Sequence, residues 1–102
     1  MLVAASFDPV EMVITLVFDR DVDGFNVLFE AIVVFDGTAV TEYRSTQDVS
    51  QPDPQTVQLL AMAAGEFTGT GVRMTAIAPT GIVSVPQGTE WAGVSNLELP
   101  FP

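Results

Sequence analysis

A short stretch of strictly alternating hydrophobicity, within residues 10–24, constrains the fold of this chain more than any other segment. Its first part, VEMVITLVF, places large apolar side chains at every second position, namely at Met12, Ile14, Leu16 and Phe18. This period of two is typical of a β-strand that buries one face. Its second part, DRDVDG, ends the pattern with a dense acidic turn. We therefore predict a core strand followed by an acidic turn.

The rest of the chain carries turn signals at short intervals, which favours an all-β fold. We expect further strands at 2–7, 32–35, 56–63, 72–78, 82–85 and 94–99, and a short turn or helix within 25–31. Asp36-Gly37 lies between IVVF and TAVTEY and predicts a two-residue hairpin turn. The polar segment 45–55, with Pro52 and Pro54, predicts a surface loop. Residues 1–102 are thus expected to form one domain, a β-sandwich of about seven short strands.

The composition excludes several classes of function. The chain has neither cysteine nor histidine, so disulfides, zinc sites and histidine-dependent catalysis are not expected. Thirteen acidic residues face three arginines, which gives a formal net charge of -10. Phosphate backbones repel such a chain, so we expect no nucleic-acid partner. The longest apolar run, 27–35, is too short to cross a bilayer and contains Glu30, so membrane insertion is not expected either.

The apolar content is high for a soluble domain. Apolar residues make up 48% of the chain and charged residues only 16%, against roughly 25% charged residues in ordinary domains. Two interpretations stay open at this point. The first is that part of the apolar area meets other chains, which include further copies in a homo-oligomer. The second is that the sandwich has a well-filled core beneath a surface of Ser, Thr and Gln. On the first interpretation, the net charge indicates a neutral or basic partner surface.

The acidic turn is the candidate metal site. Asp19, Asp21, Asp23, Gly24 and Glu30 satisfy the spacing D-x-D-x-D-G-x5-E, in which carboxylates surround a calcium ion. An EF-hand needs helices on both sides, whereas a strand precedes Asp19, so a true EF-hand is not expected. Two alternatives are left, a calcium-binding strand turn that uses Asp19, Asp21 and Asp23, or a solvated acidic turn without a cation. No other cofactor is expected.

Two further features are candidates for a binding or catalytic site. Trp91, flanked by glycines, is interpreted as a core or interface side chain in preference to one that stacks on a sugar. Acidic pairs such as Glu90 with Glu98 resemble those of glycosidases, but any chain with this many acids contains such pairs. A sandwich of this size rarely builds the required cleft, so we expect no enzymatic activity.

Four segments of the chain together resemble a known family of domains. They are SFDPVEMVITLVFDRDVDG, IVVFDG, TVQLLA and GVRMTAIAPTGIVSV, and the strongest match is ITLVF followed by DVD. This succession is similar to the bacterial immunoglobulin-like domains of surface-layer and virion proteins. The resemblance implies an immunoglobulin-like β-sandwich. The closing D-x-x-G-N turn of that family is replaced here by Pro79-Thr80-Gly81.

The resemblance also indicates a role. Chains of this size without a signal peptide are similar to small accessory proteins of phage particles, and 1–5 has no basic leader, so we expect assembly in the host cytoplasm. The leading hypothesis is a non-enzymatic structural protein of a virion, such as a capsid decoration or cement subunit. Its partner would be a protein lattice formed by a major capsid or tail protein. The alternative is a calcium- or glycan-binding adhesion module of a cell surface.

Overall fold

The computed structural model describes residues 2–8, 11–36, 43–61 and 72–100, and these are almost entirely β-structure. The strands are β1 (Leu2–Asp8), β2 (Val13–Phe18), β3 (Val22–Asp23), β4 (Ile32–Asp36), β5 (Tyr43–Asp53), β6 (Thr56–Ala61), β7 (Val72–Ile77), β8 (Val83–Ser84) and β9 (Gly93–Leu99). One short 3-10 helix, η1 (Phe29–Ala31), precedes β4, where a short turn or helix was predicted. In this part of the chain no helix is long and apolar enough to span a membrane. The all-β prediction is confirmed.

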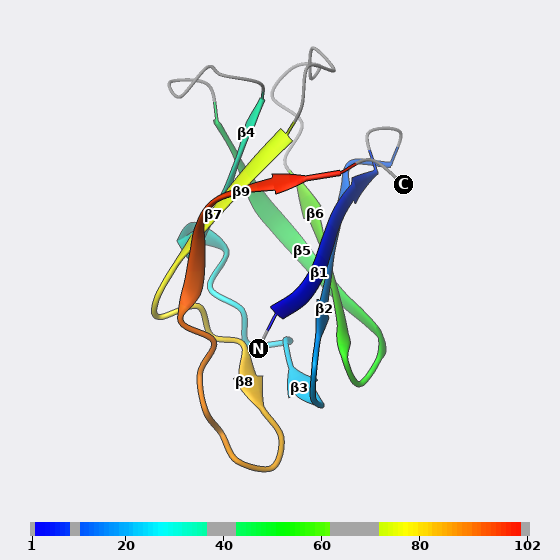
Figure 1. Ribbon diagram of the computed structural model, residues 1–102, viewed down its shortest axis with the longest axis vertical. Coiled ribbons are helices and arrows are strands. Elements are labelled where there is room, and N and C mark those ends of the chain that lie inside the picture. The colour runs from blue at the N-terminus through cyan, green and yellow to red at the C-terminus, as the bar shows by residue number, and fades with distance from the viewer. Residues whose placement is uncertain (1, 9–10, 37–42, 62–71, 101–102) are drawn as a thin grey trace.

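The strand order is that of an immunoglobulin-like sandwich. Seven strands form one antiparallel sheet in the order β1-β2-β6-β5-β4-β7-β9, and β3 pairs with β8. Strand β5 belongs to both layers, because its C-terminal part pairs with β6 and its N-terminal part pairs with β4 (Figure 1). If the seven strands are lettered A to G in chain order, the neighbours are A-B-E-D and C-F-G. This is the order of a constant-type immunoglobulin domain.

The alternating strand forms the centre of the core, as predicted. In β2 the side chains of Ile14 and Leu16 are fully buried and that of Phe18 is 2% exposed. The same parity holds in the strands that pair or pack with it, where the buried residues include Val57, Leu59, Val72 and Met74. Apolar side chains from both layers therefore meet in one core.

The predicted surface loop over 45–55 is wrong, because most of that segment is the strand β5. Its backbone pairs on both edges, with β4 and with β6, although the side chains of Asp48 and Ser50 are exposed. Pro52 is tolerated because it falls where the register with β6 shifts, between Ser50 and Asp53. A strand is held by backbone hydrogen bonds to its neighbours and does not require an apolar face. The polar sequence of β5 therefore gave no indication of a strand.

Strand β4 pairs with β5, and the register of this pair is not that of the predicted two-residue turn. Phe35 lies opposite Tyr43, whereas a two-residue turn at Asp36-Gly37 would place Phe35 opposite Thr38. Asp36 instead continues β4 and lies opposite Val72 of β7. The connecting residues 37–42 lie outside the described residues.

Candidate functional site

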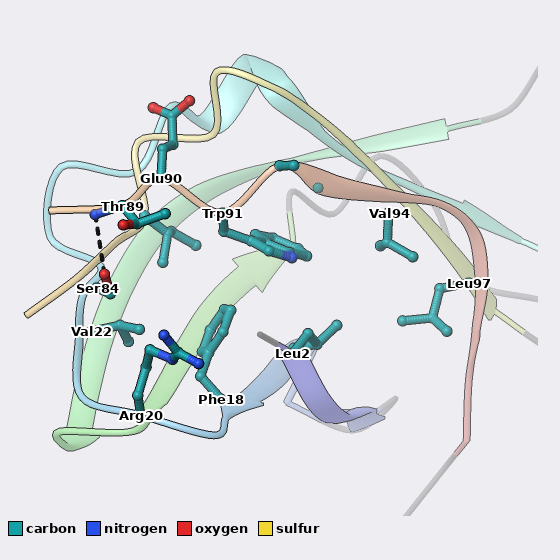
Figure 2. Close-up of a pocket in the computed structure, with 13 residues that line it drawn as sticks. Leu2, Phe18, Arg20, Val22, Ser84, Thr89, Glu90, Trp91, Val94 and Leu97 are labelled. Atoms are coloured by element: carbon teal, nitrogen blue, oxygen red, sulfur yellow. Dashed lines mark hydrogen bonds between the residues drawn. The ribbon is translucent and has the colours of Figure 1, made fainter. Parts of the chain in front are cut away.

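One hollow of the described structure lies between the two edge strands of the sandwich. It is a pocket of about 520 Å³ that opens between β1 and the segment leading into β9. Figure 2 shows Phe18 and Trp91 on its inner side and Leu2, Val94 and Leu97 along the wall formed by the edge strands. These side chains are apolar, so the pocket favours apolar groups through burial and not through polar recognition.

Trp91 is held in the wall of this pocket by its backbone. Its N–H donates to the carbonyl oxygen of Ile82 at 2.8 Å, and its own carbonyl accepts from the Thr80 hydroxyl at 2.7 Å. The indole meets the ring of Phe18 edge to face, with centroids 5.5 Å apart and planes at 82°. Trp91 is half-buried and packs against the core, in agreement with its interpretation as a core or interface residue.

The polar groups around the pocket are engaged in local structure. The Ser84 N–H donates to the carbonyl of Thr89 at 2.8 Å, and the Thr89 N–H donates to Ser84 Oγ at 3.1 Å, which closes the turn after β8. The Glu90 carboxylate points away from the pocket (Figure 2) and lies 3.4 Å from the N–H of Gly81. Arg20 lies at the mouth beside Phe18 (Figure 2), with Nε 3.1 Å from Asp19 Oδ1. This arrangement offers apolar burial and no base positioned on the Ser84 hydroxyl.

The three carboxylates of the candidate metal site are not brought together. Asp19 pairs with Arg20, and Asp23 Oδ1 accepts the N–H of Phe25 at 3.0 Å, as in a turn capped by its own aspartate. Asp21 is exposed. Within the described part of the chain, which includes all three, no group of three or more acidic side chains is placed to hold a metal ion. The described structure therefore does not assemble the three carboxylates into one group, and both alternatives for this turn stay predictions.

Asp19 has an unusual acidity. The pKa of the Asp19 carboxyl is lowered from 3.8 to about 2, in part because the cationic Arg20 side chain donates a hydrogen bond to it and favours its charged form. The result is a carboxylate that stays ionised at all physiological pH values, which suits a local ion pair and does not suit a general acid.

A second feature is a set of exposed apolar side chains on neighbouring segments. Phe25 and Leu28 lie between β3 and η1, and Ile77 ends β7; their side chains are 63%, 37% and 65% exposed, and we call them the loop patch. Backbone contacts tie their segments together, since the Leu28 N–H donates to the carbonyl of Thr80 at 2.8 Å. The register also places Ala76, next to Ile77, opposite Ile32 at the end of η1. Large apolar side chains of this exposure are typical of interaction sites when they group.

Sequence reasoning did not find the pocket or the loop patch. The pocket is lined by Leu2 from the first strand and by Val94 and Leu97 from the last. These side chains line one pocket because the two strands form the two edges of the same sheet. No pattern within a single segment of the sequence predicts that these side chains lie close together. Phe25 and Leu28 carried a usable signal, because they are large apolar residues next to turn residues and outside any alternating pattern.

No family model, no curated protein and no solved structure matches this chain.

Proposed function

We propose that this chain is a non-enzymatic structural protein that docks on an ordered protein lattice through the loop patch. The observation that carries the proposal is the exposure of Phe25, Leu28 and Ile77 on two segments, 25–28 and the end of β7. The hydrogen bond from the Leu28 N–H to the carbonyl of Thr80 holds these segments next to each other. Burying these side chains against a partner would contribute favourably, at ~25 cal/mol per Å² of apolar surface. A chain alone in water gains nothing from displaying them.

The charge of the molecule specifies the kind of surface that the patch would meet. Exposed acids, Asp21 and Glu30 among them, lie on the same segments as the patch or next to them, and the formal net charge is -10. A strongly acidic partner would repel this face, whereas a neutral or basic lattice would attract it. The acids would also restrain self-association in favour of docking on a different protein.

The type of lattice follows from the resemblance to immunoglobulin-like virion domains. The strand order of the sandwich supports that resemblance at the level of fold, and fold alone does not fix function. On this basis the lattice would be a major capsid or tail protein, and the chain would be a decoration, cement or other accessory subunit. The local bonds of Ser84 and the outward Glu90 support a binding role over a catalytic one.

The test is co-sedimentation of the purified chain with assembled particles from its source. We expect saturable binding with a fixed number of chains per particle. The double variant Leu28→Ser/Ile77→Ser should weaken binding at least about tenfold, while Val85→Ser should bind like the parent. Val85 is a suitable control because it is 45% exposed and lies outside the loop patch. Equal binding by all three proteins would contradict the docking surface.

Salt separates the contributions of charge and apolar burial in the same experiment. The Debye length falls to about 3 Å at 1 M salt, so steering by the acids should be lost there. We expect the association rate to fall with salt and the amount bound at saturation to change little. A chain that stays in the supernatant at both low and high salt would overturn the proposed function.

A further inference from the structure

The two edge strands of the sandwich meet at one end, where a backbone hydrogen bond between described residues joins them. The Phe7 N–H, near the end of β1, donates to the carbonyl of Pro100, just after β9, at 3.0 Å. Figure 1 shows the two strands diverging from this common end. At the other end Leu2 and Val94 lie on opposite walls of the pocket. We call the opening between the strands, from Ala5 and Glu98 to Leu2 and Val94, the seam.

The chain itself explains why the seam is not closed by a ladder. The next rungs of a parallel pair would join the Ala5 N–H to the carbonyl of Glu98 and the N–H of residue 100 to the carbonyl of Ala5. Residue 100 is a proline and has no N–H to donate. The first rung is also not among the hydrogen bonds of the described residues. Strand alternation turns the N–H and C=O of Ala5 to the same side as those of Phe7, so both face the seam.

The floor of the seam is apolar and large. The pocket of about 520 Å³ beneath it exceeds the ~150 Å³ that holds one benzene molecule in an engineered cavity. It therefore has room for more than one apolar side chain. In an extended segment every second side chain projects to the same face, so neighbouring side chains of that face would enter the pocket together.

The charge at the rim indicates the flanks of such a segment. The exposed Glu90 carboxylate is turned outward beside the pocket, Glu98 is exposed on β9 opposite Arg73 of β7, and the cation at the mouth, Arg20, is engaged with Asp19. The net charge of -10 adds to this field. A fatty acid or another anionic apolar molecule would be repelled, whereas lysines or arginines that flank an apolar segment would be attracted.

We infer that the seam is a second binding site, which takes an extended segment of a partner protein with alternating apolar residues and basic flanks. The backbone of the segment would pair with the outward N–H and C=O of Ala5 on β1, as in β-strand addition. Its apolar side chains would fill the pocket against Phe18 and Trp91. This site is separate from the loop patch, so it holds or fails independently of the proposed docking surface.

The test uses synthetic peptides and the single tryptophan of the chain as reporter. The panel consists of peptides in which Val, Leu or Phe alternates with Thr, each made with Lys flanks and with Glu flanks. We expect Lys-flanked members to shift the emission of Trp91 in a saturable way and Glu-flanked members to bind at least about tenfold more weakly. N-methylation of the peptide backbone on the edge that would pair with Ala5 should weaken binding by a similar factor. These comparisons require no change to the protein.

A matched pair of variants locates the site. Val94→Phe fills the pocket from its wall, whereas Val85→Phe adds the same bulk at a residue that is 45% exposed and does not line the pocket. We expect Val94→Phe to lose peptide binding at least about tenfold and Val85→Phe to retain it.

Several results would overturn the inference. If no panel member shifts the emission of Trp91 in the parent chain, or if Val94→Phe binds like the parent, the seam does not take a peptide. Tight binding of an aliphatic alcohol that N-methylation-sensitive peptides cannot displace would show a small-molecule pocket instead. Dimerisation that Val94→Phe abolishes without peptide would assign the seam to a second copy of the chain.

Discussion

Phe18 is the residue at which the core and the pocket meet. Its ring is 2% exposed, ends the buried face of β2 and supports the indole of Trp91 edge to face. We expect Phe18→Ala to lower the free energy of unfolding by ~3 to 5 kcal/mol, because truncation leaves a cavity on the core side and removes an aromatic contact. Urea denaturation followed by circular dichroism measures this change.

Phe25→Ala is the matched control for that experiment. Phe25 is 63% exposed, so the same truncation should change stability by no more than ~0.5 kcal/mol. A loss below ~1 kcal/mol for Phe18→Ala would show that the ring is not packed as described.

The entry into β9 depends on one glycine. Gly93 has φ +92, and a Cβ at this position would overlap the carbonyl oxygen of Ala76 on the paired strand β7. Gly88 has a similar φ of +76, but no heavy atom lies within 4 Å of its Cβ position. A side chain at either glycine would therefore be strained by the left-handed backbone. Only at Gly93 would it also clash with the neighbouring strand.

From this difference we expect Gly88→Ala to cost ~1 to 2 kcal/mol, the penalty for a side chain in the left-handed region. Gly93→Ala should cost clearly more, because β7 and β9 must separate locally to relieve the overlap. Thermal and urea unfolding of the two variants measure the difference. Equal destabilisation would mean that β9 does not approach β7 as closely as described.

At the scale of elements, the sequence predicts those strands whose side chains alternate. Ile14 and Leu16 in β2, and Val57 and Leu59 in β6, are buried at the predicted parity. β5 was missed because its place between β4 and β6 is set by backbone pairing on both edges, which leaves no apolar period in the side chains. Register is likewise set by partners distant in sequence, so the Asp36-Gly37 dipeptide alone did not determine it.

The candidate sites also differ in how far the sequence predicts them. The acidic turn could be recognised in the sequence because its three carboxylates lie at every second position, but this spacing does not fix where the side chains point. Asp19 turns to Arg20, and Asp23 accepts a hydrogen bond from the backbone of its own turn. The pocket could not be predicted from the sequence because its walls come from the first and last strands. A site formed by strand order can be found only from the fold, whereas sequence spacing suggests a candidate site whose geometry still depends on the fold.

At the scale of the whole molecule, net charge and the loop patch act against each other. The formal net charge is -10 at pH 7 and vanishes near pH 4.1. Repulsion between copies therefore disappears as the pH falls, while the apolar side chains of Phe25, Leu28 and Ile77 stay exposed. We expect the chain to be monomeric at neutral pH and to self-associate as the pH approaches 4.1, which sedimentation velocity measures.

The pKa of Asp19 excludes one competing explanation for such association, the loss of its ion pair. A carboxylate whose pKa is lowered on folding stabilises the fold above its ordinary pKa of 3.8, and this contribution is lost only as the pH falls through about 2. The Asp19–Arg20 contact is therefore intact where association begins. Leu28→Ser/Ile77→Ser should associate less than the parent at the same pH, because it keeps the charge and loses most of the loop patch. If the double variant associates to the same extent, apolar surface other than the loop patch drives self-association.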